Sequence, residues 1–192
     1  MPVKKLPFKS LNQLLSKCLV TQEEEKTDLL IKSLKIVKAR GYLTKKELED
    51  ICRWKSPRAI HHIKSNKPAV IRKITTDAFA TRSERSKIEL LTSLRGVSLP
   101  MASAILTLIN PKRYGVIDIR VWELLFSLGT VNSKPKGVNF GFNEWFRLLS
   151  ILRYYSDKYS TSVRKIEYSI FLVHQQYQDG ILYQNLNKRK TD

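Results

Sequence analysis

The chain has 192 residues, enough for one sizeable core or for two small helical lobes that share a cleft. Its 35 Lys and Arg residues against 17 Asp and Glu residues give a formal net charge of +18, which is typical of proteins that contact phosphate backbones. At 42% hydrophobic residues the chain should fold, and two cysteines, Cys18 and Cys52, exclude a four-cysteine zinc site or iron–sulfur cluster within it.

The same composition bears on the cellular location and the class of partner. Two widely spaced thiols are typical of a reducing compartment rather than of a disulfide framework. No run approaches the ~18 apolar residues of a membrane span, and residues 1–7 lack an apolar segment of signal-peptide length. We therefore expect an intracellular protein (cytoplasm and nucleoid, or nucleus) without a membrane partner. Ribosomal and membrane-surface proteins are also basic, so the charge alone does not select DNA.

The first third of the chain predicts helices. Residues 1–9 are basic and contain two prolines, which indicates an arm. Apolar residues at helical spacing predict a helix over 11–20. A second, longer helix is expected over 23–40, because it opens with acidic residues and Gly41 follows its end.

The middle of the chain predicts several short helices. Thr44–Glu47 and Thr81–Glu84 have the form of capping boxes, and each predicts a helix start. Another short helix should contain His61 and His62. These neighbours would point about 100° apart on a helix, unlike the i, i+4 pairs that share a metal, so we expect no metal site.

A tight turn between two helices is the most distinctive local pattern. One helix should end at Leu94, the chain should turn through Gly96, and a second helix should start at Ser98 and stop at Asn110. The N–H groups at the start of the second helix would offer a cradle for phosphate.

Asp118 precedes the next apolar helix, which contains Trp122 as an expected core residue. The simplest role for Asp118 is an N-cap. The cap does not exclude a chemical role, because N–H groups at a helix start favour the ionised carboxylate and lower its pKa. A fixed anion of this kind can stabilise positive charge on a sugar.

The remaining elements are a basic loop over 129–141 with Lys134 and Lys136, and helices over 143–155 and 160–177. The first of these helices should bury one broad face, formed by Trp145, Phe146, Leu148, Leu149 and Leu152.

These elements together predict an all-α protein. We expect a basic arm over 1–9, a single two-lobed helical unit over 10–180 with the hairpin at 83–109, and a basic tail over 181–192.

Leu94–Ser98 with Ala102, followed by Val116–Val121, resembles the helix-hairpin-helix DNA glycosylase superfamily of the endonuclease III type. There the hairpin reads L-P-G-V-G-x-x-T-A, and the catalytic aspartate lies in a V-D-x-x-V-x-R segment. The resemblance covers residues 83–129 closely. It implies a two-lobed helical bundle that binds duplex DNA, flips out a damaged or modified nucleotide and excises its base. It implies no cofactor here, since this chain lacks the iron–sulfur cluster of some members.

The resemblance and the residues themselves together predict roles for particular positions. Asp118 would stabilise the sugar cation. Tyr114 could stack on a base in the pocket, and Trp54 could line the far wall of that pocket or clamp the DNA backbone, although each has an alternative role in packing. The residues that would contact DNA are Arg95, Gly96, Val97, Ser98, Leu99, Arg120, Lys134 and Lys136. For Arg95 and Arg120 the alternatives are a surface arginine and a partner that holds Asp118.

Two departures from the family pattern bear on the chemistry. Bifunctional members carry a lysine at the position of Pro100, so the resemblance implies a monofunctional glycosylase that uses water. Ser98 replaces the second hairpin glycine. Both departures favour the alternative of a non-catalytic DNA-binding module or accessory subunit, and a basic RNA-associated helical protein is a third possibility.

Overall fold

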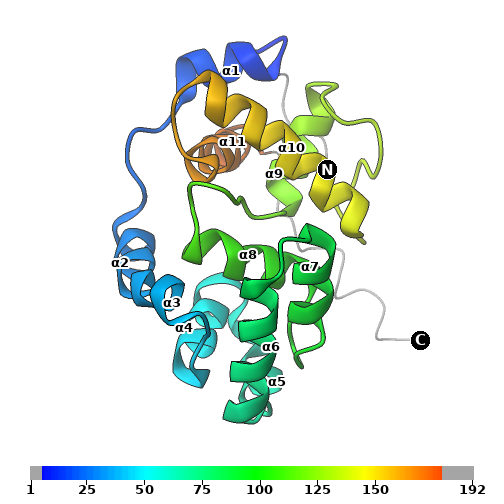
Figure 1. Ribbon diagram of the computed structural model, residues 1–192. Helices are drawn as coiled ribbons and strands as arrows, with labels where there is room; N and C mark the ends of the chain where they lie inside the picture. The colour runs from blue at the N-terminus through cyan, green and yellow to red at the C-terminus, as the bar shows by residue number, and fades with distance from the viewer. Residues whose placement is uncertain (1–5, 179–192) are drawn as a thin grey trace, which may run out of the picture.

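The computed structural model describes residues 6–178, and the predicted all-α class is confirmed for them (Figure 1). The helices are α1 (Leu11–Cys18), α2 (Glu25–Ser33), α3 (Lys35–Arg40), α4 (Lys45–Lys55), the 3-10 turn η1 (Pro57–Ala59), α5 (Ile60–Lys64), α6 (Pro68–Ala80), α7 (Glu84–Thr92), α8 (Leu99–Ile109), α9 (Ile119–Ser127), α10 (Phe142–Lys158) and α11 (Val163–Tyr177). The expected tail over 181–192 and the first five residues of the expected arm lie outside the described residues.

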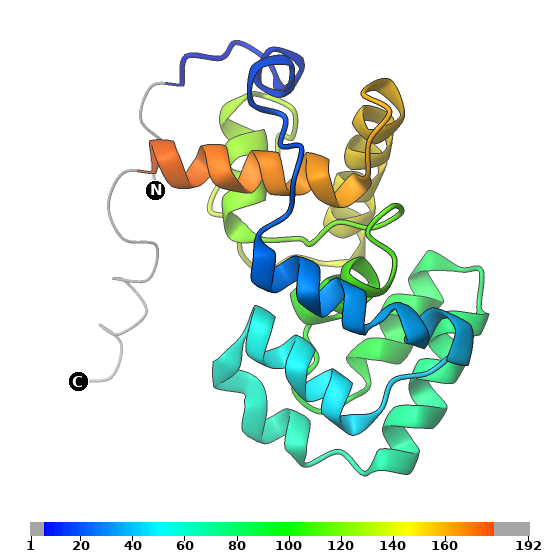
Figure 2. The ribbon, with the colours of Figure 1, turned by 90° about the vertical axis from the view of Figure 1, so that its left-hand side faces the viewer.

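The helices form two groups that are not contiguous in sequence (Figure 2). Helix α11 packs on α9, α10 and α1, and these four helices form the first lobe. Helices α2 to α8 form the second lobe, in which α6 packs on α7 and α4 packs on α5 and α8. The chain therefore begins in the first lobe, builds the second lobe, and returns to the first through residues 110–118.

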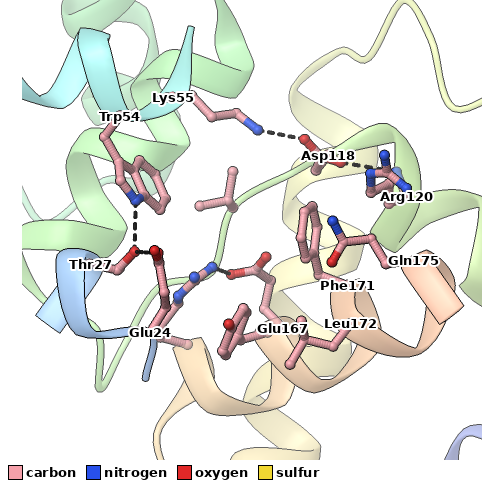
Figure 3. A pocket seen from close by; sticks show the side chains of 13 residues that line it. Glu24, Thr27, Trp54, Lys55, Asp118, Arg120, Glu167, Phe171, Leu172 and Gln175 are labelled. Carbon is pink, nitrogen blue, oxygen red and sulfur yellow. Dashed lines mark hydrogen bonds and ion pairs between the residues drawn. The ribbon is translucent and has the colours of Figure 1, made fainter. Parts of the chain in front are cut away.

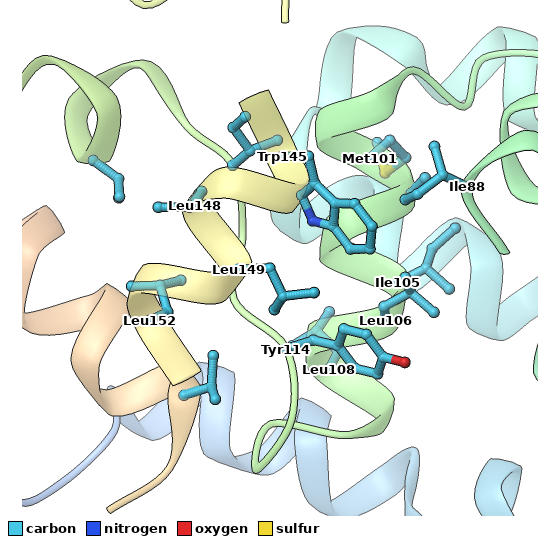
Figure 4. Packing of buried hydrophobic residues seen from close by; sticks show 14 of the residues in the cluster. Ile88, Met101, Ile105, Leu106, Leu108, Tyr114, Trp145, Leu148, Leu149 and Leu152 are labelled. Carbon is cyan, nitrogen blue, oxygen red and sulfur yellow. The ribbon is translucent and has the colours of Figure 1, made fainter. Parts of the chain in front are cut away.

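The core joins the two lobes. Buried side chains of α10, including Trp145 and Leu149, face buried side chains of α8 such as Ile105 (Figure 4). Trp122 is buried as predicted, and its indole N–H donates to the Ser133 carbonyl over 2.9 Å. The prediction for Phe146 is wrong, because its side chain is 44% exposed on a flank of α10.

Most predicted helix boundaries agree with the structure, with two corrections. The helix expected over 23–40 is interrupted at Leu34, which ends α2 and precedes α3. The side chain of Leu34 is buried, and its N–H still donates to the Leu30 carbonyl, so the break is local. The capping box at Thr44 is present, but α7 is capped by Ser83, which accepts from the Ser86 N–H, and not by Thr81.

The turn between α7 and α8 is held by a residue that the sequence analysis did not single out. The side-chain oxygen of Asn66 accepts from the Arg95 N–H, and its amide donates to the Arg95 carbonyl, each over 2.9 Å. Gly96 follows with φ of +81°, and a Cβ placed on it would lie 2.7 Å from the Cβ of His62 in α5. Both backbone conformation and space therefore require glycine at this turn.

The substitution Gly96→Ala is expected to destabilise the protein more than Gly41→Ala. Gly41 has an almost identical φ of +82° but no neighbour within 4 Å, so its replacement should cost only the backbone strain of about 1–2 kcal/mol. Gly96→Ala should cost about 1–3 kcal/mol more, because the turn must move away from His62. Equal free energies of unfolding in urea for the two variants would contradict this.

Candidate active site and nucleic-acid interface

Asp118 lies between the two lobes, as the N-cap of α9. Its Oδ1 accepts from the Arg120 N–H over 3.0 Å, which confirms the predicted cap. Its Oδ2 is 2.5 Å from Nζ of Lys55, the last residue of α4 in the other lobe. The two side chains are only 21% and 17% exposed, so this ion pair is poorly solvated.

The carboxyl group of Asp118 is held in its ionised form. Burial by itself would raise its pKa, but the charge and hydrogen bond of Lys55 and the N–H of Arg120 lower it by more. The net result is a pKa below the usual range for aspartate. The side chain is thus an anion at neutral pH and is not sealed among apolar groups.

Two cavities meet at the Lys55–Asp118 pair, and both residues line each cavity. The first has a volume of about 410 Å³, and Trp54 and Phe171 lie on opposite sides of it (Figure 3). The second has a volume of about 400 Å³ and extends to the start of α8 and to residues 137–140. Each volume is in the range of small-molecule sites.

The first cavity has an ordered polar wall opposite Asp118. The indole N–H of Trp54 donates to the hydroxyl of Thr27 over 2.9 Å, and this hydroxyl donates to the carboxylate of Glu24 over 2.8 Å. Trp54 is therefore fixed in place, and of the two residues predicted for a base pocket it is the one that lines this cavity. Neither Glu24 nor Thr27 was predicted to lie at this site.

A buried charge cluster lies beside this cavity. The guanidinium of Arg164 on α11 bonds to Glu23, between α1 and α2, and to Glu167. Burial raises the pKa of Glu167 even though the charge of Arg164 opposes the change. The same guanidinium lies 5.5 Å from the ring centroid of Trp54, so it also supports the aromatic wall.

The hairpin presents the free N–H groups that the sequence analysis expected. Within the described part of the chain, the N–H groups of Gly96, Ser98 and Leu99 have no hydrogen-bond partner. Ser98 is exposed and occupies the N-cap position of α8, but its side chain makes no capping bond. Arg95 is also exposed, whereas the side chain of Val97 is buried, so only its backbone could face a ligand.

Of the other residues predicted to contact DNA, Arg120 lies at a cavity beside Asp118 and the two lysines do not. Arg120 lines the first cavity, with its guanidinium 5.6 Å from the ring centroid of Phe171 and bonded to Gln178. Lys136 is exposed and Lys134 donates to the Asn139 carbonyl, but neither lysine lines the two cavities.

The structure does not place Tyr114 at the site. Its ring is buried in the core, stacks on Trp145 at 6.5 Å between centroids, and lines neither cavity beside Asp118. Its hydroxyl donates to Glu84 over 3.0 Å, and burial raises its pKa to about 12. The alternative role that we weighed, packing of the segment against the core, is the one observed.

His174 forms a second buried contact near Asp118, and its surroundings predict that the stability of the fold depends on pH. Its Nε2 lies 3.0 Å from Oε2 of Glu123, and burial lowers its pKa although this contact and the charge of Asp118 oppose the change. The charge of Arg120 adds to the lowering. Neutral His174 is therefore the form that folding favours.

The free energy of unfolding should fall as the pH drops below about 6.5. His174 in the unfolded chain then binds a proton, whereas burial disfavours the same protonation in the folded chain. Urea unfolding between pH 7 and pH 5 should show this loss, and it should be smaller in His174→Gln. An identical pH dependence in the variant would contradict it.

The described residues contain no group of three or more His, Cys, Asp or Glu side chains suited to a metal ion. No helix among them is both long enough and apolar enough to span a membrane. Comparison of the chain with protein-family models, with curated proteins and with solved structures finds no significant match.

Proposed function

We propose that the protein is a DNA N-glycosylase of the helix-hairpin-helix type, which binds duplex DNA and excises a modified base. The observation that carries this proposal is the position of Asp118. It is an ionised, poorly solvated carboxylate at the junction of two cavities, close to a hairpin with free N–H groups.

The geometry supports separate roles for the two lobes, with the second lobe binding the DNA backbone and the first lobe carrying Asp118. The second lobe supplies the hairpin, whose free N–H groups suit a phosphate oxygen. The second cavity runs from the start of α8 to Asp118, so a strand held at the hairpin would lead toward the carboxylate. The net charge of +18 favours the approach of a polyanion.

The first cavity suits an extruded base. Trp54 and Phe171 provide aromatic faces, and base stacking on such faces contributes about 1–3 kcal/mol per base. Breaking the bond between the base and C1′ builds positive charge on the sugar. The fixed anion of Asp118 would stabilise that charge, and a low pKa keeps it available at neutral pH.

A non-catalytic duplex-binding module is the second candidate. It is favoured by the pairing of Asp118, because both carboxylate oxygens already have partners, as in a purely structural cap. In that case the hairpin would bind the backbone and the cavities would hold no reacting nucleotide.

An excision assay separates the two candidates. Duplexes that each carry one deaminated, oxidised or alkylated base are incubated with excess protein, and abasic sites are revealed by alkaline cleavage. We expect cleavage at one class of base. Binding to the same duplexes should weaken with salt, the slope of log affinity against log salt gaining about −0.9 per phosphate contact.

Absence of excision across the whole panel, with tight duplex binding retained, would support the non-catalytic module. Preference for structured RNA over duplex DNA in competition would contradict both candidates.

A further inference from the structure

Three carboxyl side chains line the first cavity in the described part of the chain, those of Glu24, Asp118 and Glu167. Glu24 is exposed and Asp118 is 21% exposed, whereas Glu167 on α11 is only 2% exposed. The carboxyl group of Glu167 points into the cavity (Figure 3). Its Oε2 accepts from Arg164, and its Oε1 has no hydrogen-bond partner among residues 6–178. Glu167 therefore directs an unpaired oxygen at whatever fills the cavity.

The charges nearest to Glu167 favour a proton on it. Arg164 supplies one positive charge but contacts two carboxyl groups. Glu23 accepts from two of its nitrogens, Nε over 2.8 Å and Nη2 over 3.1 Å, in the fork geometry that suits an ionised carboxylate. Glu167 accepts from Nη1 alone. It is thus the surplus carboxyl group of the cluster, and its neutral form costs less to bury than its anion.

Charged groups of the other elements around the cavity also act on Glu167. Lys55 from α4 favours its anion, and Asp118 at the start of α9 favours its neutral form. These two groups are paired with each other, so their effects oppose one another. Burial then dominates and raises the pKa of Glu167, while the pKa of Asp118 is lowered. Two carboxyl groups in one cavity whose pKa values are shifted in opposite directions suit an acid and a fixed anion.

We propose that Glu167 is the general acid of base excision, and that it gives a proton to the base as the bond between the base and C1′ breaks. The proposal rests on the proposed function, because it concerns the base that the first cavity would hold. It narrows the substrate to a neutral modified base. Such a base leaves as an anion unless an acid protonates it, whereas a base that already carries a positive charge leaves without this help.

The step needs no co-reactant other than water. A proton passes from Glu167 to a ring nitrogen or an exocyclic oxygen of the base. The electron pair of the bond to C1′ moves to the base, and the sugar is left with a positive charge beside Asp118. Water adds to C1′ and releases a proton to solvent. After the base departs, the Glu167 carboxylate takes up a proton from solvent, so the net change is hydrolysis of the N-glycosyl bond.

Carbon-13 NMR of the carboxyl groups tests the inference without DNA. The full-length protein, labelled at the side-chain carboxyl carbon of glutamate, is titrated between about pH 4 and pH 8, and the resonance that is missing in Glu167→Gln identifies Glu167. We expect this resonance to titrate well above about pH 4.3, the ordinary value for glutamate. Titration at or below that pH would overturn the inference, whatever the duplex assays show.

Single-turnover excision of a neutral modified base tests the catalytic step. Glu167→Gln keeps a carbonyl oxygen for Arg164 but has no acidic proton, and it should slow excision about 100-fold or more. The rate of the parent should fall as the pH rises through the pKa of Glu167, and the variant should lack this fall. A merely structural role of Glu167 would leave the shape of the pH profile unchanged.

Glu123→Gln is the matched control. Glu123 is only 4% exposed and contacts His174, a basic side chain of the same helix α11, over 3.0 Å. It lines neither cavity beside Asp118. The excision rate and the pH profile of this variant should equal those of the parent, and urea unfolding checks that both variants are folded.

The outcomes distinguish this inference from the proposed function. Excision by the parent with an unchanged rate and pH profile in Glu167→Gln would overturn the inference alone. Excision confined to a cationic base such as 7-methylguanine would also overturn the inference and leave the proposed function intact. Absence of excision across the whole panel would overturn both.

Discussion

Replacing Asp118 with Asn should lower single-turnover base excision about 100- to 1000-fold, a loss similar to that of other groups that stabilise charge in a transition state. Asparagine has almost the same shape but carries no charge, so it cannot stabilise the sugar cation. The measurement is the rate of abasic-site formation at saturating protein, with the modified duplex that the parent cleaves best.

The same variant should fold nearly as well as the parent. Asparagine caps a helix about as well as aspartate, and the unpaired Lys55 should add a cost of about 1 kcal/mol. Asp77→Asn is the control, since Asp77 pairs with Lys73 over 2.9 Å on an exposed face of α6. An Asp118→Asn variant with unchanged excision would reduce Asp118 to a structural cap.

Replacing Arg164 with Ala should destabilise the protein by about 3–5 kcal/mol, because it leaves the buried carboxylate of Glu167 and that of Glu23 without their counter-charge. Urea unfolding at pH 8 measures the effect. It should shrink toward pH 5, where Glu167 takes up a proton more readily, since burial already raises its pKa.

Arg53→Ala is the matched control for this prediction. Arg53 also pairs with two carboxylates, those of Glu49 and Asp50, but it is 50% exposed. Its replacement should change the free energy of unfolding by about 1 kcal/mol or less. Similar losses of unfolding free energy in Arg53→Ala and Arg164→Ala would contradict the argument that burial makes the Arg164 ion pairs matter more for stability.

Local patterns in the sequence predicted the local structure. The period of apolar residues placed the helices, and short-range chemistry placed the cap at Asp118 and the left-handed turn at Gly96, because each depends on neighbours a few residues away. Leu34 shows the limit of this approach, since the apolar pattern runs on without a sign of the break between α2 and α3.

The pairings that build the site could not be predicted in this way. Lys55 meets Asp118, and Asn66 meets Arg95, across long stretches of chain whose approach depends on the packing of whole helices. Tyr114 illustrates the reverse problem. An aromatic side chain beside a candidate site fits both a base pocket and a core, and only its burial distinguishes them.

The ion pair between Lys55 and Asp118 is also a direct contact between the two lobes. Two segments, residues 19–24 and 110–118, connect the lobes, and the first cavity is lined by Glu24 of the first segment and by Val116 and Asp118 of the second. A ligand that separates the amine from the carboxylate must offset the loss of this contact. The affinity of such a ligand and the stability of the junction between the lobes are therefore thermodynamically linked.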